Sequence, residues 1–151
     1  MVQISPAAIA DLPKLIELEN MLFSSDRIPP RQFRYILSRA NGITVKIEEN
    51  GMLAGYLILL KRRNCGNLRI YSIGINPAAQ HRGYARSLVD YAIQTAAKLR
   101  LRRVTLEVCE HNSAALKLYA GAGFYRYGVK IGYYQDGCTA LLLRKDLEER
   151  I

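Results

Sequence analysis

The sequence has few cysteines and lacks a long apolar run, and both shortages restrict the class of protein. Its three cysteines, Cys65, Cys109 and Cys138, are odd in number and widely spaced. This pattern argues against a disulfide framework and against a zinc cage, and it predicts a reducing, cytosolic location. The longest apolar run, Leu57 to Leu60, is far too short to cross a bilayer, so no membrane segment is expected.

Two further features are missing. Met1-Val2-Gln3 does not lead into a basic segment followed by an apolar one, so no secretory signal peptide is expected. The sequence also has no run of five or more basic residues, which argues against a nucleic-acid-binding tail.

The net charge is nevertheless +9, with 22 basic and 13 acidic residues. This excess favours acidic partners such as a phosphorylated cofactor, an acidic protein or RNA. We favour a solvated basic surface with a coenzyme pocket.

The 151 residues suit a single domain over 1–151, and half of them are hydrophobic, which is enough for a sizeable core. The patterning indicates a strand, two helices, a β meander and then a strand–helix–strand unit, which predicts an α/β sheet with helices on both faces. The expected strands are 2–5, 43–47, 53–60, 70–75, 103–110, 124–130 and 139–143, and the expected helices are 11–23, 31–39, a long one ending near 99, and 113 to 119 or 120.

The stretch from Leu68 to Leu99 predicts an anion site. Its apolar run Ile70–Ile75 is typical of a buried strand, and Asn76-Pro77 stops that strand. The loop Gln80–Ala85 follows and opens a long amphipathic helix, whose first amides lack helical partners and attract phosphate. Gly83 allows close backbone approach. The loop is neither a Walker loop nor a Rossmann fingerprint, and taken alone it fits an ordinary turn into a surface helix equally well.

Two groups of residues carry a family resemblance. Ile73-Gly74-Ile75-Asn76-Pro77, followed by Gln80-x-x-Gly83-x-Ala85, resembles the acetyl-CoA signature of the GNAT N-acetyltransferases. Leu106-Glu107-Val108, the segment Asn112–Tyr119 and Gly121–Phe124 resemble the second signature. Tyr133-Tyr134 is similar to the RimI-like branch, which acetylates ribosomal-protein N-terminal alanines. The resemblance implies a mixed, mostly antiparallel twisted sheet of about seven strands with about four helices, in which the strands at 70–75 and 103–110 splay apart.

The resemblance also implies how acetyl-CoA is bound. Backbone amides of the central strand are the expected donors to the pantetheine arm and to the oxyanion, and the following loop is expected to hold the diphosphate. Asn112 offers an amide that suits a pantetheine group, although a helix N-cap or turn is an equally common use of asparagine. The expected coenzyme-binding residues are Ile73, Gly74, Ile75, Gln80, His81, Arg82, Gly83, Tyr84, Ala85, Arg86 and Asn112.

Glu107 is the candidate general base. Strand alternation puts this carboxylate on the face opposite Leu106 and Val108. Partial burial there would raise its pKa towards the working range of a base, and the matching glutamate of RimI-like enzymes has this role. The alternative is a structural ion pair with an arginine such as Arg103.

Tyr119 is the candidate general acid. A phenol is protonated at neutral pH and is able to donate to a departing thiolate. The matching tyrosine of the family is assigned this task, and the alternative is a core aromatic residue beside Leu116 and Leu118.

The resemblance implies that the acceptor side is built from the loops 24–30 and 130–138. There Tyr133, Tyr134 and Asp136 would grip a peptide N-terminus, or would form an ordinary aromatic turn. No metal is expected, because His81 and His111 have no ligand spacing.

These features predict an acetyl-CoA-dependent N-acetyltransferase that acts on a primary amine, favoured as the N-terminal α-amine of a protein such as a ribosomal protein. Direct transfer is expected, since Cys109 has no neighbouring histidine at a spacing that marks an acyl-thiol intermediate. A small-molecule amine acetyltransferase and a non-catalytic coenzyme-binding module are the alternatives. The sequence does not predict an oligomeric state.

Overall fold

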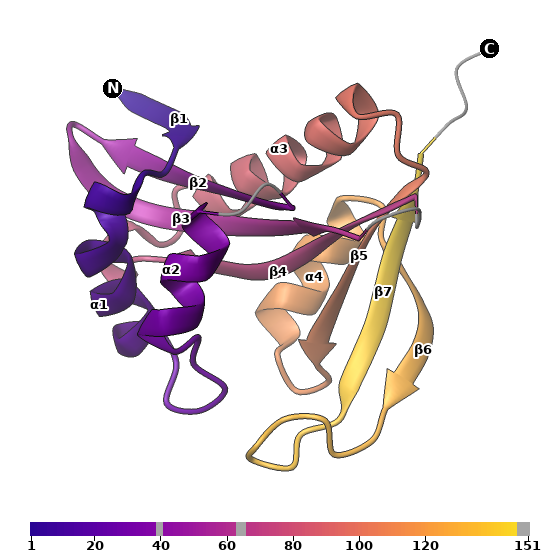
Figure 1. The fold of residues 1–151 in the computed structure, drawn as a ribbon. Helices are drawn as coiled ribbons and strands as arrows, with labels where there is room; N and C mark the ends of the chain where they lie inside the picture. Colours follow the sequence, from indigo (N-terminus) through magenta and orange to yellow (C-terminus); the bar gives the residue numbers. More distant parts are fainter. Residues whose placement is uncertain (39–40, 63–65, 148–151) are drawn as a thin grey trace.

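A twisted sheet organises the protein (Figure 1). The structure, a computed structural model, describes residues 1–38, 41–62 and 66–147. Within these ranges the sheet has seven strands in the order β1-β2-β3-β4-β5-β7-β6. The strands are β1 (Val2–Pro6), β2 (Gly42–Glu49), β3 (Met52–Lys61), β4 (Asn67–Ile75), β5 (Arg103–Cys109), β6 (Tyr125–Lys130) and β7 (Ala140–Asp146). The helices are α1 (Leu12–Leu22), α2 (Pro30–Ser38), α3 (Tyr84–Lys98) and α4 (Ser113–Gly121), with short 3-10 turns at Ile9–Asp11 and Pro77–Ala79.

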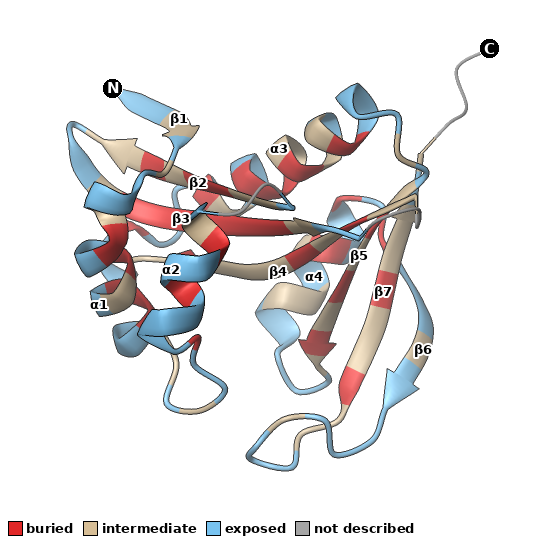
Figure 2. Cartoon of the chain, viewed as in Figure 1, coloured by how far each residue is buried: buried red, intermediate tan, exposed pale blue. Residues whose placement is uncertain are grey.

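Helices cover both faces of the sheet, as expected. On one face α1 and α2 pack over the N-terminal strands, where Leu15, Phe33 and Tyr56 are buried together. On the other face α3 and α4 pack against a larger core that includes Leu88, Leu106 and Tyr119. The burial pattern in Figure 2 alternates along β5 because successive side chains point to opposite faces of a strand. The predicted α/β architecture is therefore confirmed.

The element boundaries differ from the sequence prediction at a few places. β7 extends to Asp146, three residues beyond the expected end, because its charged residues still pair with β5 back to Arg103. β4 begins at Asn67 rather than at Ile70, because its first residues pair with the start of β5. The second helix is Pro30–Ser38, and the expected last residue Arg39 lies outside the described residues.

The two central strands diverge, which confirms the predicted wedge. β4 and β5 are parallel and pair only at Asn67↔Arg103, Leu68↔Val104 and Arg69↔Thr105. Beyond Arg69, β4 continues to Ile75, and in the described part of the chain it pairs there only with β3. The pairing with β3 skips Tyr71, which makes a β-bulge at the point where the two strands separate. Bulges bend and twist a strand, so this one turns the second half of β4 away from β5.

The expectation that the cysteines form no disulfide is wrong. Cys109 and Cys138 are bonded, with their Cα atoms 5.9 Å apart. The spacing of the two residues does not indicate this bond, because 29 positions separate them in the chain. In the sheet Cys109 pairs with Ala140, so the strand register brings Cys138 beside it. Cys65 lies outside the described residues.

No helix in the described part of the chain is long and apolar enough to cross a membrane.

Candidate active site

Two cavities meet at the second half of β4. The larger one, of about 790 Å³, lies in the wedge between β4 and β5 and reaches the loops after α1 and β6; we call it the wedge cavity. The smaller one, of about 490 Å³, lies at the N-terminus of α3; we call it the helix cavity. Residues Ile73–Ile75 line both cavities, together with Ala115 and Leu118 of α4. A long ligand seated on α3 therefore has a route into the wedge.

Glu107 faces the wedge cavity from β5, and its side chain is only 15% exposed. The Nε of Arg69 donates to its Oε2 at 3.0 Å, and the Nζ of Lys130 lies 3.8 Å from Oε1. The structural ion pair considered as an alternative therefore exists, but with Arg69 rather than Arg103, which lies 3.5 Å from Asp146. Glu107 is a carboxylate held in a fixed orientation at the wall of the cavity.

Tyr119 faces the same cavity from α4 and is buried, stacked edge-on against Phe124. Among the described residues its hydroxyl has no hydrogen-bond partner. Burial, reinforced by the neighbouring Tyr134, raises the pKa of Tyr119 to about 12. Tyr119 therefore keeps its proton well above neutral pH, so it is available as a proton donor and unsuited to act as a base.

We expect this buried phenol to make the fold sensitive to alkali. The folded pKa of Tyr119 exceeds the unfolded value near 10, so the fold loses stability as the pH rises from 10 to 12, where only the unfolded state is ionised. The loss attributable to Tyr119 is roughly 2–3 kcal/mol. Urea unfolding at several pH values would show a smaller loss for Tyr119→Phe than for the wild type. The exposed Tyr127→Phe is the control, and an equal loss in all three proteins would refute the assignment.

The N-terminus of α3 forms the floor of the helix cavity. Gly83 is its N-cap in the left-handed region, with φ of +79°, and a Cβ built there would meet no atom within 4 Å. The carbonyl of Gly83 accepts from the N–H of Ser87, which leaves the first N–H groups of the helix without helical partners. Those amides and the open space above them fit a diphosphate.

Most of the predicted coenzyme residues line this cavity. Arg82 does not: its guanidinium pairs with Glu49 of β2. Arg86 does, while also pairing with Asp90 one turn along α3 at 3.0 Å. The predicted residues found in the lining are Ile73, Gly74, Ile75, Gln80, His81, Gly83, Tyr84, Ala85 and Arg86.

Asn112 lies at the edge of the wedge cavity and caps α4, because its Oδ1 accepts the N–H of Ala115 at 3.2 Å. The helix-cap alternative is therefore present in the structure. The side-chain NH₂ donates to no described residue, so it remains available to a ligand.

Two loops line the outer part of the wedge cavity. Asp26 after α1 and Gln135 after β6 exchange hydrogen bonds: the N–H of Gln135 donates to the Asp26 carboxylate at 3.0 Å, and the N–H of Asp26 donates to Gln135 Oε1 at 3.2 Å. Tyr133, Tyr134 and Asp136 all line the cavity. The Oδ1 of Asp136 accepts the N–H of Cys138 at 2.9 Å, so this carboxylate also shapes its own turn.

Sequence reasoning missed a buried carboxylate under the first of these loops. Glu19 of α1 is 1% exposed; it accepts a hydrogen bond from the Tyr56 hydroxyl and another from the N–H of Ile28 at 2.8 Å. Burial, followed by the charge of Glu19, raises the pKa of Tyr56. Glu19 therefore fixes the loop after α1. An acidic residue on the apolar stripe of Leu15 and Leu18 was the signal that could have revealed it.

Comparison with known proteins places these features in a family. The model of the acetyltransferase (GNAT) family matches residues 12–124. The chain is 36% identical to the N-alpha-acetyltransferase RimI of Mycobacterium tuberculosis over 141 residues, covering 91% of this chain and 87% of that protein. It is 26% identical over 92 residues to a ribosomal-protein-alanine N-acetyltransferase of Escherichia coli, covering 61% of each.

The fold itself matches solved structures. The crystal structure of the ribosomal-protein-alanine N-acetyltransferase from Escherichia coli superposes with a TM-score of 0.90 at 23% identity, covering 100% of this chain and 97% of that one. The family match, the relative from Mycobacterium tuberculosis and the splayed central strands agree with one another. The chain therefore belongs to the acetyltransferase (GNAT) family and is a RimI-like acyltransferase.

Proposed function

We propose that the protein transfers the acetyl group of acetyl-CoA directly to the N-terminal α-amine of a protein, of the ribosomal-protein-alanine kind. The observation that carries this proposal is the shared wedge cavity, which Glu107 and Tyr119 both line and which opens onto the helix cavity through Ile73–Ile75. Relatives that share the fold are named for such acceptors.

The coenzyme would lie along α3. First-turn amides and Gly83 would hold its diphosphate, with Arg86 nearby. The free edge of β4 would hold its pantetheine arm, since beyond Arg69 that edge pairs with no strand among the described residues. When bound there, acetyl-CoA supplies an activated acyl group. The backbone amides around Gly74 would then face the negative charge that develops on the acyl oxygen.

Two side chains of the wedge cavity would each carry out one proton transfer. An ammonium has no lone pair, so the incoming amine must first lose a proton, and Glu107 accepts it through a water molecule. Arg69 holds that carboxylate in place. Tyr119 donates a proton or a hydrogen bond to the departing thiolate, and its raised pKa keeps the hydroxyl protonated for this task. Asp26, Asp136 and the ring of Tyr134 surround the amine's path and suit an ammonium at the entrance.

Release of coenzyme thiol tests the proposal. We expect turnover with a peptide that begins with alanine and carries an internal lysine. We expect none with the same peptide after its N-terminus has been acetylated. This pair separates the α-amine from an ε-amine. Turnover only with polyamines, aminoglycosides or free amino acids would make the protein a small-molecule acetyltransferase. Tight acetyl-CoA binding without turnover on any amine would make it a non-catalytic coenzyme-binding module.

Substitutions of Asn112 can separate its capping of α4 from its proposed contact with the coenzyme. Asn112→Ala removes the cap of α4 and should lower stability by about 1 kcal/mol. Asn112→Asp retains a good capping oxygen but lacks the amide donor, so its unfolding temperature should stay close to that of the wild type while its affinity for acetyl-CoA falls. Calorimetric titration with coenzyme and thermal unfolding give the two readouts. Unchanged affinity in the aspartate variant would leave Asn112 as a cap only.

A further inference from the structure

The 131–139 loop between β6 and β7 contains a compact turn that ends at Cys138. The N–H of Tyr134 donates to the carbonyl of Cys138 at 3.2 Å, and the N–H of Gly137 donates to the carbonyl of Tyr134 at 2.8 Å. The N–H of Cys138 in turn donates to Asp136. The turn therefore behaves as a unit, and whatever holds Cys138 also holds Tyr134 and Asp136 at the wedge cavity.

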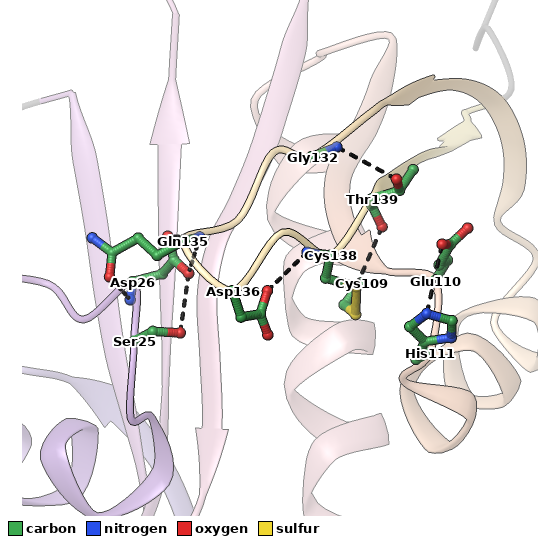
Figure 3. The surroundings of a disulfide bond; sticks show 10 residues. All are labelled: Ser25, Asp26, Cys109, Glu110, His111, Gly132, Gln135, Asp136, Cys138 and Thr139. Atoms are coloured by element: carbon green, nitrogen blue, oxygen red, sulfur yellow. Dashed lines mark hydrogen bonds and ion pairs between the residues drawn. A yellow bond between two sulfur atoms is a disulfide. The ribbon is translucent and has the colours of Figure 1, made fainter.

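A disulfide fixes the base of this turn to β5. Cys109 is the last residue of β5, two positions after Glu107, and it is bonded to Cys138 (Figure 3). At the far side of the turn, exposed hydrogen bonds join Asp26 to Gln135, and Arg69 Nη2 donates to the Tyr133 hydroxyl at 3.5 Å. Beyond the bridge, the N–H of Glu110 donates to the carbonyl of Thr139. Exposed hydrogen bonds exchange readily with water. The covalent bond is therefore the principal constraint on the position of the turn.

Both sulfur-bearing residues are within reach of small molecules. Cys109 and Cys138 are each partly exposed and line the wedge cavity. The helix cavity, by contrast, has no lining residue from the 131–139 loop. A change at this disulfide should therefore act on the acceptor side of the site and leave coenzyme binding unaltered.

We propose that Cys109 and Cys138 are a reversible thiol–disulfide modification site that sets the affinity for the acceptor. The effect on the acceptor rests on the proposed function. In the oxidised protein the turn is held in place for binding; in the reduced protein the acceptor must order it. Binding that has to order a segment is weaker by the free energy of that ordering.

The chemistry requires a low-molecular-weight disulfide, such as oxidised glutathione, as the oxidant. One cysteine thiolate attacks a sulfur of that disulfide, which forms a mixed disulfide and releases one small thiolate. The second cysteine thiolate attacks the protein sulfur of the mixed disulfide, forming the Cys109–Cys138 bond and releasing the second small thiolate. Two electrons pass to the small disulfide, and the two cysteine protons end on the two small thiols.

The test uses the full chain carrying Cys65→Ser, so that the only thiols are those of Cys109 and Cys138. The protein is equilibrated in glutathione buffers of graded redox potential, and the disulfide is quantified by alkylation and peptide mapping. Hydrogen exchange of the 131–139 loop, the KM for an alanine-terminated peptide and the Kd for acetyl-CoA are measured at each potential. We expect reduction to lower the loop's protection, to raise the peptide KM by about tenfold and to leave the coenzyme Kd unchanged.

Cys109→Ser and Cys138→Ser should each resemble the reduced protein at every potential. If these variants fail to fold, reduction of the native protein still provides the comparison. Absence of the bond under oxidising buffers, or equal loop protection in both states, would overturn the inference, as would an unchanged peptide KM. If no peptide is turned over, the proposed function fails, and hydrogen exchange then decides the inference by itself.

Discussion

Glu107→Gln is expected to lower kcat for an alanine-terminated peptide by about 10²- to 10⁴-fold, the range attributed to a positioned general base. Glutamine fills the same space at the wall of the wedge cavity, but its neutral amide is unable to accept the proton of the amine. The peptide KM and the coenzyme Kd should change little, because the proposal gives Glu107 no part in holding either ligand. Steady-state kinetics with both substrates varied would separate these quantities.

Two comparisons make the result specific. Glu110→Gln removes a carboxylate just beyond β5 that is exposed and outside the wedge cavity, so it should keep wild-type rates. Thermal unfolding controls for structure, since Glu107→Gln also removes the negative charge that pairs with Arg69. Arg69 is 36% exposed and can be solvated instead, so the cost should stay within about 1 kcal/mol. A variant of normal stability and normal kcat would remove Glu107 from the role of base.

The features that could be predicted from sequence are those that depend on residues adjacent in the chain. Gly83 at the start of α3 and the apolar strand that ends at Asn76-Pro77 are local signals, because a helix N-terminus and a strand end depend on neighbouring residues. Asn50-Gly51 is a local signal of the same kind, because this residue pair favours a tight hairpin turn, and both residues have positive φ. The first two signals placed an anion site at the start of α3, whereas the wedge between β4 and β5 was implied by the family resemblance.

The features that were missed depend on residues that are distant in the chain. Arg69 reaches Glu107 because the short parallel pairing places Arg69 beside Thr105, on the same face of β5 as Glu107. Asp26 and Gln135 are 109 positions apart and meet only because two loops converge on one cavity. Strand register decides these contacts, and an isolated sequence does not specify the register between strands that are distant in the chain.

Gly55→Ala is expected to damage both the fold and the coenzyme site, because the added methyl group would clash with the neighbouring strand β4. Gly55 of β3 pairs with Ile75, and a Cβ at Gly55 would lie 2.6 Å from the carbonyl oxygen of Gly74 and 2.8 Å from Ile75 Cδ1. A backbone oxygen cannot move alone, so β4 itself must shift. We expect a loss of about 3 kcal/mol in the free energy of unfolding, which lowers the unfolding temperature by about 6–12 °C.

Gly128→Ala is the matched control for this substitution. Gly128 also lies within a strand, but the nearest atom to its added Cβ is Leu142 Cδ1 at 3.1 Å, at the end of a flexible side chain. That variant should lose less than about 1 kcal/mol and should bind acetyl-CoA normally. Gly55→Ala should bind it more weakly even at temperatures where it is fully folded, because Ile73–Ile75 line both cavities. Equal stability and equal coenzyme affinity in the two variants would mean that β4 tolerates displacement, and the wedge would then not depend on the close approach of β3 and β4 at Gly55.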